Sequence, residues 1–178
     1  RVVTVSAGAI HSTALIAGGA VFTWGKGEHG CLGHGEDLSN QLLPKKIEAL
    51  AGRRVVAVSA GCLHNLAVAT DGSVWSWGGG GVGQLGHGDE QTQLLPKKVD
   101  ALAGRRVVTV SAGREHSLAL AADGAVWSWG GGGEGMLGHG DEQIQSQALP
   151  MRIEALAGQR VVAVSASLLH SLALTANG

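Results

Sequence analysis

Several residue types that often mark a function are scarce in this chain of 178 residues. Tyrosine is absent, phenylalanine occurs once, and charged residues make up only 15%. The formal net charge is −1, so the overall charge attracts the chain neither to nucleic acid nor to an anionic membrane surface. No run approaches the roughly 18 apolar residues of a membrane-spanning helix. We therefore expect no membrane partner.

Cysteine is also scarce. Cys31 and Cys62 are the two cysteines, and they occupy different positions of the repeat described below. A disulfide-stabilised secreted domain would carry regularly spaced cysteines. A signal peptide is not expected, because residues 2–5 already read as a β-strand. These features predict two unpaired thiols and an intracellular protein, cytoplasmic or nuclear.

Glycine, in contrast, is abundant, with 30 residues that lack the every-third spacing of collagen. Many of them belong to a tandem repeat. Val-Ser-Ala-Gly occurs at residues 5–8, 58–61 and 110–113, with an altered copy at 164–167. Two histidine series, a tryptophan series and a proline series recur at steps of 52 to 54 residues: His11, His64, His116 and His170; His34, His87 and His139; Trp24, Trp77 and Trp129; Pro44, Pro96 and Pro150. The chain is thus a single repeat domain, 1–178, with units 1–53, 54–105 and 106–159 and a partial unit 160–178.

Each unit predicts short strands rather than helices. In the second unit, residues 54–60 and 64–68 are rich in β-branched and apolar residues, and the turn signal Asp71-Gly72 leads into a hairpin partner at 73–77. A fourth segment, 95–99, contains a proline that suits an edge strand. Residues 47–50 could form one helical turn, but no helical period is sustained.

The motifs V-S-A-G-x-x-H-S-x-A-L, D-G-x-V-W-S-W-G, G-x-L-G-H-G-D and L-P, in this order, resemble the regulator of chromosome condensation repeat family. The resemblance covers essentially the whole chain. It implies an all-β fold of β-propeller blades, each a four-stranded antiparallel sheet, and the family ring has seven blades. The functions it implies are nucleotide exchange on a Ran-type small GTPase, ultraviolet-B perception, and protein interaction alone.

The chain is too short for such a ring. Three full blades plus half a blade form a partial ring, or one that another chain completes. Exposed blade edges invite pairing with another chain. We expect either a fragment of a longer protein or a homo-oligomer formed by strand exchange.

Two motifs could suggest chemistry. Residues 25–30 match G-x-G-x-x-G, but no helix follows to present its N-terminus to a phosphate. His34, His87 and His139 each lie two residues before an acid (Glu36, Asp89 and Asp141), as in a metal site or an acid–base pair. Because each blade carries one copy, the copies should lie apart, and hydrogen bonds within the histidine's own loop explain both histidine series better. We expect no catalytic residues, no metal and no cofactor.

The repeated tryptophans are expected to pack blade against blade. In the family's ultraviolet-B photoreceptor, the light-sensing tryptophans resemble a G-W-R-H-T pattern. The matching slots here hold no tryptophan, which argues against light sensing.

These slots vary while their neighbours stay fixed, and they precede a strand, where loops reach a propeller face. Apolar side chains there suggest a contact surface, although tolerated loop variation is an alternative. The predicted partner-binding residues are Ile10, Cys62, Leu63, Arg114, Glu115, Leu168 and Leu169.

Charge is segregated within the repeat. Most basic residues lie in the links between units, and many acids lie in the Gly-rich loops. The basic residues of the links are Arg1, Lys45, Lys46, Arg53, Arg54, Lys97, Lys98, Arg105, Arg106, Arg152 and Arg160. They form either a solvated rim or a stripe that touches phosphate or an acidic partner.

The sequence therefore favours a non-catalytic scaffold that binds a protein partner through the loops of one propeller face. Guanine-nucleotide exchange on a Ran-type small GTPase is the first alternative, and it rests on the family resemblance. Chromatin or nucleic-acid contact through the basic links is the second alternative.

Overall fold

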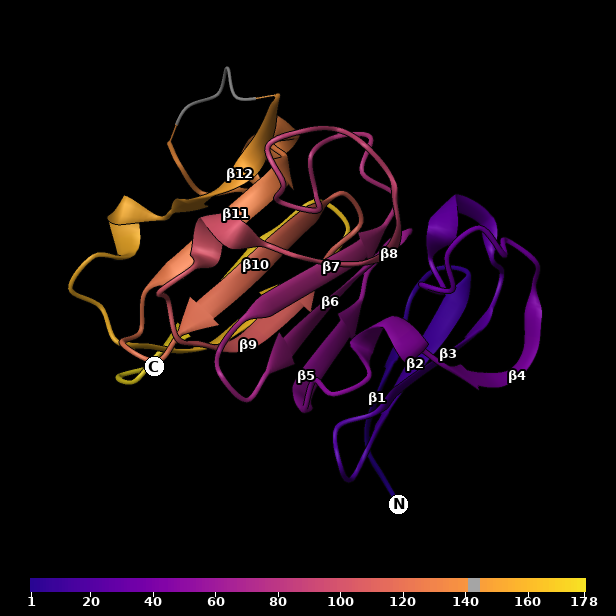
Figure 1. Cartoon of the computed structure of the whole chain (residues 1–178). Coiled ribbons are helices and arrows are strands. Elements are labelled where there is room, and N and C mark those ends of the chain that lie inside the picture. The colour runs from indigo at the N-terminus through magenta and orange to yellow at the C-terminus, as the bar shows by residue number, and fades with distance from the viewer. Residues whose placement is uncertain (141–144) are drawn as a thin grey trace.

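The computed structural model describes residues 1–140 and 145–178, and within these ranges it contains fourteen strands and five single-turn 3₁₀ helices (Figure 1). Blade 1 comprises β1 (Val2–Ala7), β2 (His11–Ile16), β3 (Val21–Gly25) and β4 (Gln41–Lys46). Blade 2 comprises β5 (Val55–Ala60), β6 (His64–Ala69), β7 (Val74–Gly78) and β8 (Gln93–Lys98). Blade 3 comprises β9 (Val107–Ala112), β10 (His116–Ala121), β11 (Val126–Gly131) and β12 (Ser146–Arg152). A half-blade comprises β13 (Val161–Ala166) and β14 (Ser171–Thr175).

The 3₁₀ helices are confined to loops and links. They are η1 (Glu28–Gly30), η2 (Glu48–Leu50), η3 (Asp100–Leu102), η4 (Gly133–Gly135) and η5 (Glu154–Leu156). The single turn expected at residues 47–50 is confirmed as η2. The all-β prediction of antiparallel four-stranded blades, with three complete and one partial, is confirmed as well.

Strand order within each blade follows the chain: short turns join the first three strands, and a Gly-rich loop joins the third strand to the fourth. Between β6 and β7, Gly72 has a φ of +81°, which glycine adopts without steric cost. Asp71 closes the turn by accepting a hydrogen bond from the Ser73 backbone N–H through Oδ1 at 3.0 Å. The predicted Asp-Gly hairpin is therefore present.

The fourth strand lies at the outer edge of each blade, which accommodates its proline. Pro96 has no N–H to donate, and the β7–β8 register shifts between the Ser76 and Gly78 pairs, opposite this segment. Beyond this irregularity Gln93 pairs with Gly78. Strand β8 therefore begins two residues earlier than the segment predicted from residue 95.

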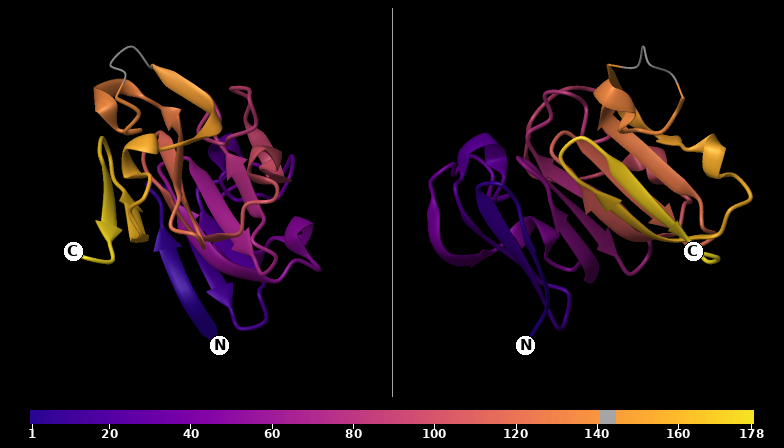
Figure 2. Two further views of the ribbon diagram at one scale, coloured as in Figure 1. Left: turned by 90° about the vertical axis from the view of Figure 1, so that its left-hand side faces the viewer. Right: turned by 180° about the vertical axis from the view of Figure 1, so that it is seen from behind.

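The blades lie side by side about a common centre, and the ring is open (Figure 2). The first strands β1, β5, β9 and β13 are successive neighbours, and the second strand of each blade packs against the first strand of the next. Equivalent side chains are thereby held one blade apart.

Buried tryptophans fill the space between blades. Trp77 of blade 2 is fully buried against Leu15, Val21 and Ile47 of blade 1. Its Nε1–H donates to the Cys31 carbonyl at 3.1 Å, and Trp129 donates in the same way to Gln84 at 2.8 Å. The predicted blade-to-blade role is confirmed for Trp77 and Trp129. Trp24, on the open side of blade 1, is only half-buried.

The Gly-rich loops reach from one blade to the next. Gly35 N–H donates to the Leu94 carbonyl of blade 2, and Gly88 N–H donates to Ala148 of blade 3, both at 3.0 Å. Gly86 has a φ of +81°, and a Cβ there would lie 2.9 Å from the Trp129 indole nitrogen. Glycine is required at this contact because the tryptophan of the next blade packs directly on the loop.

Both ends of the partial ring expose apolar side chains that are buried within it. Val2 is 54% exposed, whereas the matching Val55 is 2% exposed. In the half-blade, Leu172 is 62% exposed, whereas the matching Leu66 of blade 2 is fully buried. The exposed edges expected from the sequence are present.

Candidate interaction surface at the loop end of the blades

The antiparallel strand order gives every blade two chemically different ends. One end, called the loop end, carries the first-to-second strand loops (8–10, 61–63, 113–115 and 167–169) and the Gly-rich loops. The other end, called the link end, carries the hairpin turns and the basic links that enter the next blade. The predicted partner-binding residues therefore all belong to the loop end.

Backbone hydrogen bonds join the variable slots of successive blades. Cys62 N–H donates to the Gly113 carbonyl, and Arg114 N–H donates to the Ser167 carbonyl, both at 3.1 Å. The slots of blades 2 and 3 are thus each fixed to the loop of the next blade. The structure brings the slots of blades 2 and 3 and the half-blade into one continuous row.

In blades 1 to 3 the second residue of the slot is held through its backbone carbonyl. The carbonyls of Ile10, Leu63 and Glu115 accept hydrogen bonds from N–H groups at the ends of their third strands, at 3.0, 2.8 and 2.7 Å respectively. Ile10, Leu63 and Glu115 are half-buried, and Arg114 is exposed. The frame is independent of side-chain identity, so the side chains can vary without altering the loop.

The slots differ in chemistry from blade to blade. Ile10 and the pair Cys62–Leu63 are apolar, whereas Arg114 and Glu115 form an ion pair with Nε and Oε1 3.3 Å apart. Both side chains of this exposed pair remain about half accessible, so its contribution to stability is small. Leu168 and Leu169 are 57% and 46% exposed. The row thus places a charged pair between apolar positions.

A line of buried hydrogen bonds lies directly beneath the slots. His11 Nε2 contacts Asn65 Oδ1 at 2.8 Å, His64 Nε2 contacts Ser117 Oγ at 2.9 Å, and His116 Nε2 contacts Ser171 Oγ at 3.0 Å. The expectation that these histidines hold their own loops is wrong: each bonds to the next blade. The overlooked signal is the polar residue after each histidine, which faces the preceding blade at the start of an otherwise apolar strand.

The proton positions on these rings follow from their partners. Ser117 Oγ donates its one proton to the Gln84 carbonyl at 2.8 Å, so it accepts a hydrogen bond from His64 Nε2. His64 Nδ1 is then unprotonated, and it is buried without a hydrogen-bond partner. Burial, reinforced by His116 and His11, lowers the pKa of His64 to about 3.

The second histidine series does hold its own blade. His87 Nε2 lies 3.0 Å from Ser76 Oγ, which donates to the Leu85 carbonyl at 2.7 Å; His34 and His139 repeat the arrangement with Thr23 and Ser128. Asp89, the acid predicted beside His87, accepts from the Gln91 N–H instead. Asp141, the acid beside His139, lies outside the described residues. Within residues 1–140 and 145–178, no group of three His, Cys, Asp or Glu side chains could hold a metal ion.

Both cysteines are free thiols, as expected. Cys31 is buried, and its Sγ lies 3.2 Å from the Leu63 carbonyl oxygen and 3.0 Å from that of Glu28. Burial raises the pKa of the Cys31 thiol to about 11. Cys31 is therefore an unreactive support for the loop beneath Leu63, whereas Cys62 is half-buried within a slot.

These features define a β-propeller of tandem repeats whose loop end carries variable side chains on a constant frame. The family model of the regulator of chromosome condensation (RCC1) repeat matches residues 18–68, 71–120 and 123–174. A second family model of the same repeat matches residues 55–84 and 107–135. The chain belongs to the RCC1 repeat family.

Individual relatives are considerably longer than this chain. It is 42% identical to the E3 ubiquitin-protein ligase HERC2 of Homo sapiens, over 100% of this chain and 4% of HERC2. It is 40% identical to the ultraviolet-B receptor UVR8 of Arabidopsis thaliana, over 100% of this chain and 40% of UVR8. The crystal structure of human WBSCR16 superimposes with a TM-score of 0.89 at 27% identity, covering 100% of this chain and 46% of that one. In the described part of this chain, no helix combines the length and hydropathy required to span a membrane.

Proposed function

We propose that this chain is a non-catalytic scaffold that binds a protein partner through the loop-end slots. The observation that carries the proposal is that backbone hydrogen bonds hold the slot loops, whatever side chains the slots carry. The carbonyls of Leu63 and Glu115 accept equivalent backbone hydrogen bonds at 2.8 and 2.7 Å, although one side chain is apolar and the other is charged. A surface of this kind can be adapted to a partner without a cost in folding.

The composition of the row also supports protein recognition. The apolar Leu63 and the charged pair Arg114–Glu115 occupy neighbouring blades. Protein interfaces combine an apolar centre with charged groups that set orientation and partner choice. We therefore assign Ile10, Cys62, Leu63, Arg114, Glu115, Leu168 and Leu169 to the contact surface.

The test compares two sets of alanine substitutions. The first is the triple variant Leu63→Ala, Arg114→Ala, Glu115→Ala. The control is Leu42→Ala with Leu43→Ala, which removes two leucines that are 91% and 78% exposed on the outer strand β4. Partners recovered from cell lysate with the tagged proteins are quantified by mass spectrometry and then titrated as purified proteins.

Loss of the same partner with the triple variant, but not with the control, supports the loop-end surface. Circular dichroism should show both variants folded, because the substituted side chains lie outside the buried clusters. Equal binding by wild type and triple variant would remove the proposal.

Guanine-nucleotide exchange is the alternative that membership of the family suggests. It predicts faster release of labelled nucleotide from a small GTPase, which a panel of GTPases tests directly. Acceleration that is abolished by the triple variant would make the GTPase the partner of this surface and exchange its function.

A further inference from the structure

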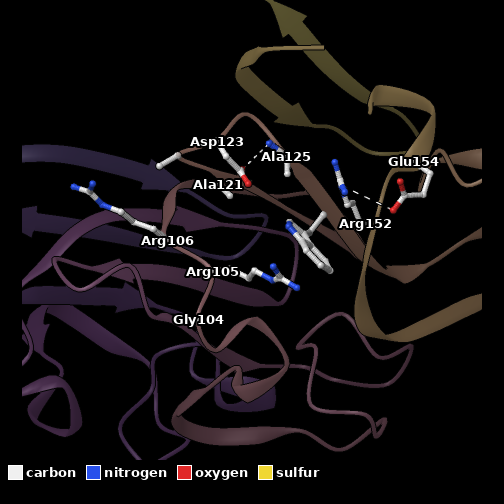
Figure 3. A pocket seen from close by; sticks show the side chains of 10 residues that line it. Gly104, Arg105, Arg106, Ala121, Asp123, Ala125, Arg152 and Glu154 are labelled. Atoms are coloured by element: carbon white, nitrogen blue, oxygen red, sulfur yellow. Dashed lines mark hydrogen bonds and ion pairs between the residues drawn. The ribbon is translucent and has the colours of Figure 1, made fainter. Parts of the chain in front are cut away.

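The link end carries a cavity that the proposed function does not use. It has a volume of about 640 Å³ and lies between the link into blade 3 and the base of that blade (Figure 3). It is lined by Arg105 and Arg106 of the link, by Arg152 at the end of β12 and by Trp127 of β11. The cavity belongs to one blade, on the opposite end from the slots.

The cavity has more hydrogen-bond donors than acceptors. Three arginines and two carboxylates line it; the Arg106 side chain points away from Arg105 and Arg152, and Asp123 is engaged by the Ala125 N–H at 3.0 Å (Figure 3). Glu154 lies 3.9 Å from Arg152 Nε, too far for a strong hydrogen bond. Within the part of the chain that the structure describes, neither Arg105 nor Arg106 forms an ion pair. The unused donors suit an oxyanion.

Blade 2 provides an internal comparison. There, Trp75 Nε1 donates to Ser73 Oγ at 3.2 Å. In blade 3 the serine is replaced by Ala125, and Trp127 Nε1 is buried without an acceptor. An oxygen placed where the serine hydroxyl lies in blade 2 would satisfy this donor. Leaving it unpaired is costly, which favours a ligand that supplies the oxygen.

A second difference points the same way. Blade 2 has Lys98 at the end of its fourth strand, and blade 3 has Arg152 at the matching position. A planar guanidinium can bind both oxygens of a carboxylate or phosphate, whereas an ammonium group acts as a point charge. In both blades the first arginine of the link that enters the blade stacks on the tryptophan. The guanidinium carbon of Arg105 lies 5.2 Å from the Trp127 ring centre, and that of Arg53 lies 5.0 Å from the Trp75 ring centre. Blade 3 thus keeps the arginine stacked on the tryptophan. It also has a second guanidinium, that of Arg152, and an indole N–H without a hydrogen-bond acceptor.

We propose that this cavity binds the oxyanion, carboxylate or phosphate, of a side chain in an acidic peptide segment of a protein. Arg105, which stacks on Trp127, and Arg152 donate to the oxyanion, and the Trp127 N–H is the remaining donor. A cavity confined to one blade fits one acidic side chain better than it fits an extended polymer backbone, and the net charge of −1 gives no long-range attraction to nucleic acid.

The experiment titrates the chain with three probes, which are an Asp/Glu hexapeptide, a phosphoserine hexapeptide of neutral sequence and inorganic phosphate, and with a DNA or RNA oligonucleotide for comparison. Binding is followed by the indole ¹H–¹⁵N resonance of Trp127, which is assigned with Trp127→Phe. The variants are Arg105→Ala and Arg152→Ala, and their blade 2 counterparts Arg53→Ala and Lys98→Ala are the controls. Thermal unfolding verifies that all four remain folded.

We expect a shift of the Trp127 resonance and an affinity that falls about tenfold or more in each blade 3 variant. The blade 2 variants should bind within twofold of wild type. The hexapeptide arms distinguish carboxylate from phosphate, and a response to either supports the site.

Two results would overturn the proposal. One is the absence of any shift with all three probes at millimolar concentration. The other is preferential binding of a DNA or RNA oligonucleotide that weakens equally in blade 2 and blade 3 variants, since that pattern describes a diffuse basic rim. Neither result bears on the loop-end surface, which is tested with different residues.

Discussion

At the scale of single residues, buried polar side chains at the loop end find their hydrogen-bond partners in the next blade rather than in their own. His11, His64 and His116 each donate to the following blade through Nε2, and their Nδ1 atoms stay buried without partners. A protonated Nδ1 would place an unpaired N–H and a positive charge in the interface. The cost of that charge is the reason for the lowered pKa values.

This arrangement predicts that stability falls in mild acid. A histidine whose pKa is lower in the folded state than its ordinary value of 6.5 stabilises the fold fully above pH 6.5. This stabilisation is lost as the pH falls toward the folded-state pKa, which is about 3 for His64. Between pH 7 and pH 5 we expect the free energy of unfolding to drop by about 2 kcal/mol through His64 alone. Urea unfolding at both values measures the change.

The control for the pH effect is His64→Gln, which cannot titrate in this range. Its loss between pH 7 and pH 5 should be smaller than that of wild type. The lowered pKa of Asp37, due first to the Ser39 hydroxyl and then to Lys45, concerns lower pH and does not confuse the comparison. An identical pH dependence for both proteins would contradict the assignment to His64.

The unpaired indole gives a second residue-scale prediction. Ala125→Ser should supply Trp127 Nε1 with the acceptor that Ser73 supplies to Trp75, and raise the free energy of unfolding by about 0.5–1.5 kcal/mol. Ser73→Ala is the reciprocal variant and should lower it by a similar amount or more, since Ser73 Oγ also contacts Asp71 Oδ1 at 2.6 Å. Urea titration measures both. A destabilised Ala125→Ser protein would show that the site cannot accommodate an oxygen.

At the scale of elements, the Gly-rich loops join one blade to the next. The repeated G-x-G-x-x-G pattern resembles a phosphate loop in sequence, but a glycine further along the same loop allows a tryptophan of the next blade to approach. A Cβ at Gly86 would lie 2.9 Å from the Trp129 indole nitrogen, and one at Gly33 would lie 3.0 Å from that of Trp77. The loops therefore contribute to the inter-blade core.

Two glycines separate the effect of this contact from backbone strain. Gly86 and Gly104 have φ values of +81° and +77°, but nothing lies within 4 Å of a Cβ at Gly104. Gly104→Ala should cost about 1–2 kcal/mol in unfolding free energy through strain alone. Gly86→Ala should cost about 1–3 kcal/mol more, because Trp129 must move. Equal losses in chemical denaturation would mean that the loop yields freely and is not a rigid contact.

Much of the element scale was predictable from the sequence. The repeat period, the Asp71-Gly72 hairpin and the edge position of Pro96 follow from local turn and strand chemistry. The hydrogen bond from His64 to Ser117 was not predicted, because spacing within one unit does not reveal which side chain the next blade presents. The cavity beside Trp127 was missed as well, although the replacement of Ser73 by Ala125 in the third unit could have indicated it.

At the scale of the whole molecule, the open ring leaves two apolar faces accessible. Val2 and Val5 of blade 1 are 54% and 67% exposed, and Leu172 and Leu174 of the half-blade are 62% and 52% exposed. For these 178 residues expressed alone, we expect concentration-dependent self-association in sedimentation velocity. Leu172→Glu with Leu174→Glu should shift the chain toward its 18.0 kDa monomer, whereas Leu42→Glu with Leu43→Glu should not. A wild-type monomer at all concentrations would contradict the expectation.

The central claim is that the loop end presents interchangeable side chains on a frame that does not depend on them. Exchanging two slots tests it most directly: Cys62→Arg, Leu63→Glu, Arg114→Cys and Glu115→Leu keep the composition and move the charged pair by one blade. The account predicts a melting temperature within a few degrees of wild type and loss of binding to the partner recovered with wild type. Unchanged binding, or a protein that no longer folds, would contradict it.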